Sequence, residues 1–232
     1  MLAGASLAVE DGQFVGLVGP SGSGKSSLLR AVIGLQAPLE GTVEREVARS
    51  DVAILFQDDA LLPWKTARDN VALALTLNGL SRRAALEQAD VWLDRLGLAG
   101  FGHRFPRHLS GGQRKRVALA QVLAPKPKLL LMDEPFASLD AIVRARIIQD
   151  VADLVAREHI SVLLVTHDLE EAISLSDRIY LLSQGPRAHL SRDYPVPLPR
   201  PRDPVRARAH PAFGPLYEKI WNDLSHEVDR RP

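Results

Sequence analysis

The glycine-rich stretch near the N-terminus has the residue types and spacing of a phosphate-binding loop. It fits the pattern G-x-x-x-x-G-K-[ST] and comprises Gly19, Pro20, Ser21, Gly22, Ser23, Gly24, Lys25 and Ser26, followed by Ser27. An apolar run precedes it and a helical pattern follows it, so backbone N–H groups and a positive helix end suit a polyphosphate. We expect Lys25 to reach the β- and γ-phosphates and Ser26 to ligate Mg²⁺. The alternative is a Gly/Ser loop that only turns the chain.

Two acidic residues follow a second apolar run. Residues 129–132 indicate a buried strand, and Asp133 and Glu134 come directly after it. Open α/β sheets bind ligands at the carboxyl ends of their strands, which is where Asp133 falls. We expect Asp133 to hold Mg²⁺ through water, and Glu134 to orient and polarise an attacking water. The alternative is an Asp-Glu turn at the surface.

A second pair of glycines precedes another helical pattern. Ser110, Gly111, Gly112 and Gln113 would supply a second set of N–H donors and a second positive helix end. One chain rarely needs two such sites for one nucleotide. Two chains related by a two-fold axis do need them, because each could close this segment over the γ-phosphate bound by the other. The alternative is a helix N-cap with Ser110 as the capping residue.

The elements that must position these residues alternate along the chain. Apolar runs predict strands at residues 14–18, 52–56, 129–132, 162–165 and 179–182, with helices between them. This alternation predicts an α/β fold with a mostly parallel sheet covered on both faces, over 1–59 and 109–184. Helical patterns at 69–77 and 81–96 predict a small helical subdomain inserted over 60–108. We expect a single domain over 1–232.

The two ends of the chain give weaker patterns. Residues 5–9 alternate and could form one edge strand. Residues 185–211 are rich in proline and arginine and suit an extended surface segment, with solvated arginines or, as the alternative, arginines at lipid headgroups. An apolar stripe from Phe213 to Leu224 predicts a docking helix packed on the domain rather than a partner site.

Composition limits the function classes. The chain has 232 residues and a net charge of +1, so no global field favours nucleic acid as a partner. It contains no cysteine, which excludes disulfides and thiolate metal sites. No apolar run approaches the ~18 residues that a membrane-spanning helix needs, and no signal peptide opens the chain. We expect any membrane connection to go through a partner protein.

The motifs together resemble those of the nucleotide-binding subunits of ABC transporters, over about residues 5–225. Their order and spacing match throughout: Walker A at 19–26, the Q-loop Gln57, the signature at 109–113, Walker B at 129–134, the D-loop Ser138-Leu139-Asp140 and the H-loop His167. The segments Leu61-Leu62-Pro63-Trp64 and Leu198-Pro199-Arg200-Pro201-Arg202 look more narrowly like the nitrate, sulfonate and taurine importer group.

The resemblance implies a P-loop NTPase (RecA-like) core that hydrolyses ATP to drive transport. Gln57 would sense Mg²⁺ and the γ-phosphate, His167 would contact the γ-phosphate, and Asp140 would couple two ATP sites across a homodimer. Integral-membrane permease subunits and a separate extracytoplasmic solute-binding protein would complete the importer, at the cytoplasmic face of the inner membrane. The family usually has more chain before its P-loop, so the 18 residues before Gly19 predict a reduced N-terminal antiparallel part.

Several alternatives stay open. His167 could simply precede a helix that Asp168 caps. Trp64, Leu61 and Leu62 could form an exposed knob that receives a permease helix, or the core of the helical insertion. A soluble ABC ATPase of DNA repair or translation is a rival function, although the long coiled-coil insertion or second cassette of such proteins is not found here. A regulatory ABC subunit with weak or no hydrolysis is another.

Overall fold

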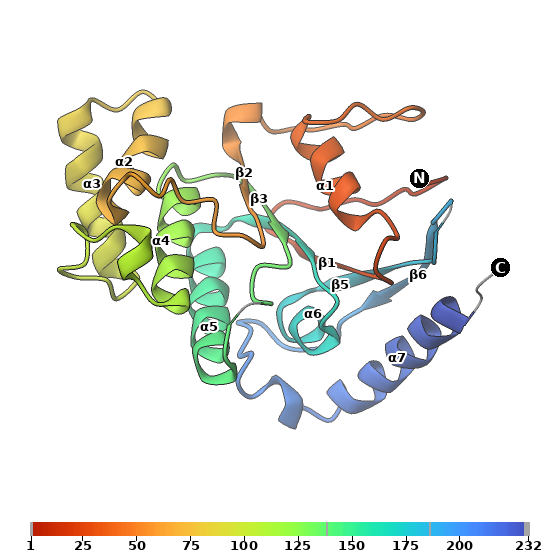
Figure 1. The fold of residues 1–232 in the computed structure, drawn as a ribbon. Coiled ribbons are helices and arrows are strands. Elements are labelled where there is room, and N and C mark those ends of the chain that lie inside the picture. The colour runs from red at the N-terminus through yellow and green to blue at the C-terminus, as the bar shows by residue number, and fades with distance from the viewer. Residues whose placement is uncertain (1, 138, 186, 230–232) are drawn as a thin grey trace.

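A six-stranded sheet forms the centre of the molecule, in the order β2-β3-β4-β1-β5-β6 (Figure 1). The computed structural model describes residues 2–137, 139–185 and 187–229. The strands are β1 Phe14–Val18, β2 Val52–Leu55, β3 Leu129–Asp133, β4 Ser161–Val165, β5 Arg178–Leu182 and β6 Leu190–Pro195. All pairings are parallel except that of β5 with β6. The expected α/β fold with a mostly parallel sheet is therefore confirmed.

Helices cover both faces of this sheet. The helix α1 (Lys25–Ile33) packs on one face, where Leu29 joins Leu131 and Leu163 in one apolar cluster. Their sequence neighbours Leu130 and Leu164 face the opposite side, where α4 (Gly111–Leu123) and α5 (Ala141–Glu158) pack. Successive residues of a strand point to opposite faces, so two-sided burial requires the continuous apolar runs seen in β3 and β4.

The remaining helices extend this arrangement at either end. The helices α2 (Ala67–Leu77) and α3 (Arg82–Arg95) pack on each other and on α4, away from the strands (Figure 1). The helices α6 (Leu169–Leu175) and α7 (Phe213–Asp229) share an apolar cluster with β1 and β5. Short 3₁₀ turns span Arg49–Asp51, Pro106–His108 and Ala207–Ala209. None of the helices in the described ranges combines the length and apolarity that crossing a membrane requires.

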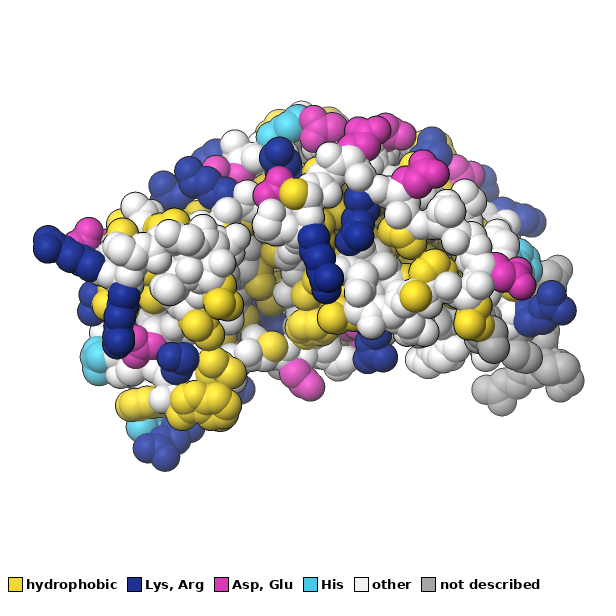
Figure 2. Space-filling view, turned by 90° about the horizontal axis from the view of Figure 1, so that it is seen from above, with side chains coloured by type: hydrophobic (Ala, Val, Ile, Leu, Met, Phe, Trp, Pro, Cys, Tyr) yellow, Lys and Arg dark blue, Asp and Glu magenta, His cyan; other side chains and the backbone are white. Residues whose placement is uncertain are grey.

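The Leu-Leu-Pro-Trp segment lies in the loop before α2, where the structure tests whether it is an exposed knob or part of the core. Leu61 packs against the main apolar cluster, whereas the Trp64 side chain is 70% exposed. The buried Asn70 holds the loop, because its Oδ1 accepts from the Leu62 N–H at 2.7 Å and its Nδ2 donates to nearby carbonyls. In Figure 2, hydrophobic side chains project together at the end of the molecule that carries α2 and α3. Leu61 therefore belongs to the core, and Trp64 is part of an exposed knob.

One expectation at the chain ends is wrong, and a second, the extended surface segment over 185–211, is incomplete. Residues 5–9 form no strand, although Leu7 and Val9 pack against the α1 side of the sheet. The segment 185–211 contains β6, which pairs with β5 through Tyr180↔Asp193 and its neighbours. The sequence of β6 shows no alternation of apolar and polar residues, because Tyr194 is the only buried residue of this strand. An edge strand of this kind depends on its partner rather than on its own pattern.

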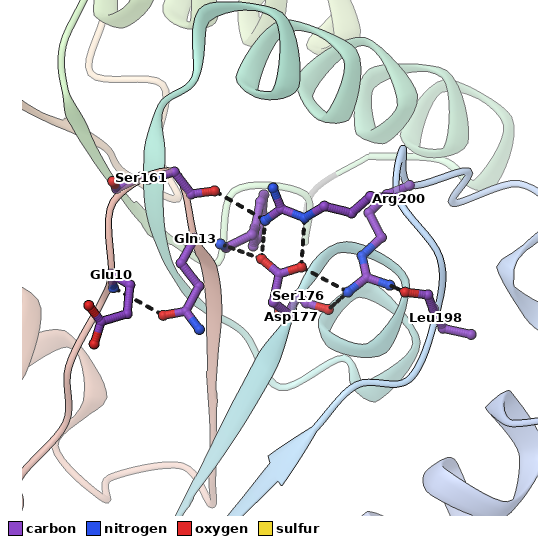
Figure 3. Close-up of polar contacts among 10 residues, drawn as sticks. Glu10, Gln13, Ser161, Ser176, Asp177, Leu198 and Arg200 are labelled. Atoms are coloured by element: carbon purple, nitrogen blue, oxygen red, sulfur yellow. Dashed lines mark hydrogen bonds and ion pairs between the residues drawn. The ribbon is translucent and has the colours of Figure 1, made fainter.

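Three arginines of the C-terminal segment, at 200, 202 and 208, bind acidic side chains of the core, whereas Arg206 is exposed and pairs with its neighbour Asp203. Arg200 and Arg202 converge on Asp177 at the start of β5 (Figure 3). Arg202 also donates to the Ser176 carbonyl at 2.7 Å. Arg208 pairs with Glu170. These contacts tie the segment 198–208 to the core at three points, although most of its residues remain exposed.

Asp177 accepts hydrogen bonds from both Arg200 and Arg202, and we call these three residues the clasp. Burial alone would raise the pKa of Asp177, but hydrogen bonds from Arg200 and the Phe14 N–H, together with the charges of both arginines, lower that pKa below its usual value. The carboxylate is thus held ionised between two guanidinium groups (Figure 3).

We expect Asp177→Ala to lower the free energy of unfolding by about 2–3 kcal/mol, because the buried Arg202 and the Phe14 N–H would lose their partner. Urea denaturation measures this loss. Asp193→Ala is the matched control, since it removes the partner of Arg178 in an ion pair exposed on both sides, and its effect should be much smaller. Equal effects of the two variants would contradict a stabilising clasp.

Candidate functional site

The predicted site residues meet at one edge of the sheet. The loop 19–26 follows β1, Gln57 comes two residues after β2, Asp133 ends β3, and His167 comes two residues after β4. These strands are parallel and adjacent in the order β2-β3-β4-β1, so their carboxyl ends lie side by side. This is the edge at which open α/β sheets bind ligands.

The glycine-rich loop leaves its helix end without a side-chain partner. Gly24 occupies the N-cap position of α1 with a φ of 97°, a conformation that favours glycine, and no side chain caps the helix. The first turn of α1 holds no acidic residue. Ser23 is 2% exposed, and its Oγ has no hydrogen-bond partner within the described residues. Free N–H donors and an unsatisfied buried hydroxyl are what an anion such as a phosphate would satisfy.

Lys25 is buried within this loop. Its Nζ donates to the carbonyls of Gly19 at 2.7 Å and Pro20 at 2.8 Å. Burial lowers the pKa of Lys25, while the nearby carboxylates of Glu134 and Asp133 act to raise it. The ammonium group is thus in the loop and close to both carboxylates, and it carries one more N–H donor than the two that the loop carbonyls accept.

Ser26 and Asp133 come together from two elements. The Ser26 Oγ donates to Asp133 Oδ1 at 3.1 Å. A hydroxyl and a carboxylate are oxygen ligands of the kind Mg²⁺ takes when phosphates and waters supply the rest of its shell. Among the described residues, no three His, Cys, Asp or Glu side chains group into a metal cage. Gln57 is exposed and makes no hydrogen bond to Ser26 or Asp133 in this described part of the chain.

Glu134 and His167 form a second contact at this edge. His167 Nδ1 lies 3.1 Å from Glu134 Oε2, and the Glu134 side chain is 25% exposed. Glu134 has a φ of 45°, a left-handed conformation that is costly for a residue with a side chain. Its N–H donates to the Val165 carbonyl at 2.8 Å, which fixes the turn after β3 against the end of β4. The backbone thus holds the carboxylate in a strained position beside the histidine.

A polar network lies directly behind His167. Asp168 caps α6 by accepting from the N–H groups of Glu170 and Glu171, so the capped-helix interpretation of this segment is correct as local structure. Glu171 is 6% exposed, and its Oε2 accepts from the Thr166 hydroxyl at 2.9 Å. Glu171 is not among the residues predicted from the sequence to belong to the site. Glu171 comes three residues after the cap Asp168, where a glutamate side chain can fold back toward the start of the helix, and this spacing is the sequence signal that could have identified it.

The signature segment begins α4 with a capping box. The Gln113 N–H donates to Ser110 Oγ at 3.3 Å, and the Ser110 N–H donates to Gln113 Oε1 at 3.0 Å. Ser110 is exposed, so the N-cap role leaves it accessible. Gly112 is required for packing, because a Cβ there would lie 2.5 Å from Val143 Cγ1 of α5. The helices α4 and α1 lie apart in Figure 1, on opposite sides of β2 and β3.

Asp140 lies exposed at the start of α5. Its carboxylate accepts from the Val143 N–H at 3.0 Å and so caps the helix. Leu139, one residue before, is buried. Ser138, the first residue of the predicted D-loop, lies outside the described residues.

Comparisons with known proteins identify the family. A family model described as "ABC transporter" matches residues 2–137, more than half of the chain, and the chain therefore belongs to the ABC transporter family. A solved ATP-binding cassette, described as a dimer in a post-hydrolysis state bound to ADP and Pi, has a TM-score of 0.73 and 31% identity. The match covers 84% of this chain and 90% of that one.

Curated relatives belong to import systems. An aliphatic sulfonates import ATP-binding protein of Burkholderia thailandensis is 46% identical over 95% of this chain and 63% of its own length. A bicarbonate transport ATP-binding protein of Synechocystis is 39% identical over 97% of the chain, which spans only 35% of that relative. A nitrate import ATP-binding protein of Synechocystis is 40% identical over 88% of the chain and 79% of its own length.

The ionisation of Glu171 makes the stability of the folded protein depend on pH. Burial, and then the charge of Asp168, raise the pKa of Glu171 to about 7, although the Thr166 hydrogen bond and the charges of Arg144 and His167 oppose this. An acid whose pKa is raised on folding binds its proton more tightly in the folded state. Its contribution to stability is therefore lost as the pH rises from about 4.5 to about 7.

We expect wild-type protein to lose up to about 3 kcal/mol of unfolding free energy relative to Glu171→Gln across that interval, because glutamine keeps the shape and cannot ionise. Urea denaturation of both proteins at a series of pH values measures the difference. Glu218→Gln, exposed on α7, controls for the general effect of removing a charge. A constant difference between wild type and Glu171→Gln would contradict the prediction.

Proposed function

We propose that this chain is the ATP-binding and hydrolysing subunit of an ABC importer. The observation that carries the proposal is the convergence of Lys25, the Ser26–Asp133 pair and Glu134 at one edge of the sheet, next to an uncapped helix end. Phosphate donors, a place for Mg²⁺ and a carboxylate able to orient water are the parts that phosphoryl transfer to water needs.

Each residue at this edge takes a distinct role. The loop 19–27 and Lys25 bind the phosphates of ATP, and Ser26 and Asp133 hold Mg²⁺, with Gln57 approaching from β2. Bound Mg²⁺ neutralises charge on the phosphate oxygens. Glu134 orients and polarises the attacking water, and its contact with His167 at 3.1 Å keeps the carboxylate at the crevice. His167 also contacts the γ-phosphate.

Two copies of the chain enclose the nucleotides. Ser110, Gly111, Gly112 and Gln113 of one copy close over the γ-phosphate on the other, and Asp140 couples the two sites. The exposure of Ser110 supports this arrangement, and so does the separation of α4, which Ser110 caps, from α1 (Figure 1). A similar cassette has also been solved as a dimer. The symmetric contact makes each site depend on both copies.

Transport requires further proteins. Permease subunits in the membrane would contact residues 57–70, where Trp64 is exposed, and would hold the ATPase at the cytoplasmic face of the inner membrane. A separate extracytoplasmic receptor would bind the cargo, a sulfonate, taurine, nitrate or related small solute. The relatives named for aliphatic sulfonates and for nitrate support two of these classes. Co-purification with both partners, followed by a ligand screen on the receptor, identifies that cargo.

Glu134→Gln should lower the ATP turnover of the purified protein by at least about 100-fold, because glutamine keeps the size of the side chain but cannot act as a base. Phosphate release under saturating MgATP measures the rate. Glu87→Gln, on the exposed face of α3, is the matched control and should turn over at the wild-type rate. Equal rates for wild type and Glu134→Gln would overturn the mechanism and favour a regulatory subunit that does not hydrolyse ATP.

Glu134→Gln should form dimers at millimolar MgATP, because the bound nucleotides would hold the two copies together without being hydrolysed. Light scattering during size exclusion gives the mass. Adding Ser110→Asp should restore the monomer, since aspartate still caps α4 but places a negative charge against the partner's phosphate. Ser81→Asp at the N-cap of α3 is the control. A monomeric Glu134→Gln would contradict the two-copy arrangement.

A further inference from the structure

One arginine joins two loops of the site. Arg144 lies in the first turns of α5, and its Nη2 donates to the Leu139 carbonyl at 3.2 Å. Its Nη1 lies 3.4 Å from Asp168 Oδ2. Leu139 precedes the exposed Asp140, and Asp168 follows His167. A single guanidinium group therefore holds both the loop at the start of α5 and the loop at the start of α6.

We call the connection from Leu139 through Arg144 to Asp168 the link. Its Asp168 end is fixed by further hydrogen bonds. The second carboxylate oxygen of Asp168 accepts from the Glu170 and Glu171 N–H groups, and the Asp168 N–H donates to the Thr166 hydroxyl at 3.0 Å. The Thr166 hydroxyl in turn donates to the buried Glu171. His167 lies between two residues held in this way, so a displacement of Asp168 would move the histidine relative to Glu134.

The link is not needed to form either helix. Asp140 caps α5 through the Val143 N–H, and Asp168 caps α6 through its other oxygen. Arg144 adds a connection between the two helix starts. Its Nε is buried without a hydrogen-bond partner in the described part of the chain, so its two terminal nitrogens make all of its polar contacts there. The planar guanidinium holds its donors in fixed directions, toward the Leu139 carbonyl and toward Asp168, and the ammonium group of a lysine does not reproduce that geometry.

We propose that Arg144 is a positioning residue that sets the Asp140 loop and the His167 loop in a fixed relation. The inference rests on the proposed function, in which Asp140 faces the second copy and His167 faces the hydrolytic site. Approach of the second copy at Asp140 would then be transmitted through Leu139 and Arg144 to Asp168, and so to the His167–Glu134 contact. Hydrolysis would be tied to closure of the dimer by this one side chain.

Four variants test the link. Arg144→Ala removes it, Arg144→Lys keeps the charge but not the fork, and Asp168→Asn keeps the α6 cap but not the ionic attraction. Arg146→Ala, exposed on the same helix, is the matched control. We expect the first three to lower kcat for ATP by about tenfold or more, with KM changed by less than about twofold, because misplacement affects the reacting geometry and not binding. Arg144→Ala and Asp168→Asn combined should lose no more than either alone.

Amide hydrogen exchange tests the same link without requiring ATP hydrolysis. Peptides covering 137–143 and 166–171 should exchange faster in Arg144→Ala and in Asp168→Asn than in wild type or Arg146→Ala. Unchanged exchange in both segments, wild-type kcat in Arg144→Ala, or additive losses in the double variant would overturn the inference. If wild type and Arg146→Ala fail to hydrolyse ATP while the exchange changes occur, the proposed function fails and the structural link stands.

Discussion

The register between β3 and β4 is the constraint on which the rest of the site depends. Asp133 is the last residue paired in this ladder, opposite Val165, and the next N–H, that of Glu134, donates to the Val165 carbonyl. This pairing places Glu134 beside His167 and leaves Asp133 directed toward Ser26. A shift of one residue would turn both carboxylates to the other face of the sheet and move the apolar residues of β3 out of their clusters. Core packing and site geometry are thus fixed by the same pairing.

Features whose cause is local could be predicted from the sequence. The apolar runs of β1 to β5 and the caps Ser110 of α4 and Asp168 of α6 act through neighbours a few residues away. The caps Thr66 of α2 and Asp140 of α5 were not predicted. One end of each of β2, β3, β4 and β5 differs by one residue from expectation. The edge strand β6 and the clasp of Arg200 and Arg202 on Asp177 could not be predicted, because each needs a partner eight or more residues away whose identity the local pattern does not carry.

Helix caps coincide with the candidate site residues Ser110 and Asp140, and a third cap, Asp168, directly follows His167. This resolves alternatives that appeared exclusive in the sequence. Ser110, Asp140 and Asp168 each cap a helix through their side-chain oxygens. Capping fixes the backbone before the helix, which is the loop that must present a donor or a histidine. The capping interpretation of Ser110 and of the segment at His167 is therefore part of how the site could work, since an unfixed loop would cost entropy each time a ligand ordered it.

The shortest helix of the site needs the most external support. At seven residues, α6 is too short to be stable alone, yet its first turn carries the cap that fixes His167. Glu170 near its start pairs with Arg208, the carbonyl of Ser176 at its end accepts from Arg202, and its apolar face packs against Phe213 and Ile220. The C-terminal segment therefore stabilises the histidine loop from one side while Arg144 holds it from the other. A chain in which residues 198–220 were loosened would keep every motif of the site and still lose the support that orients one of them.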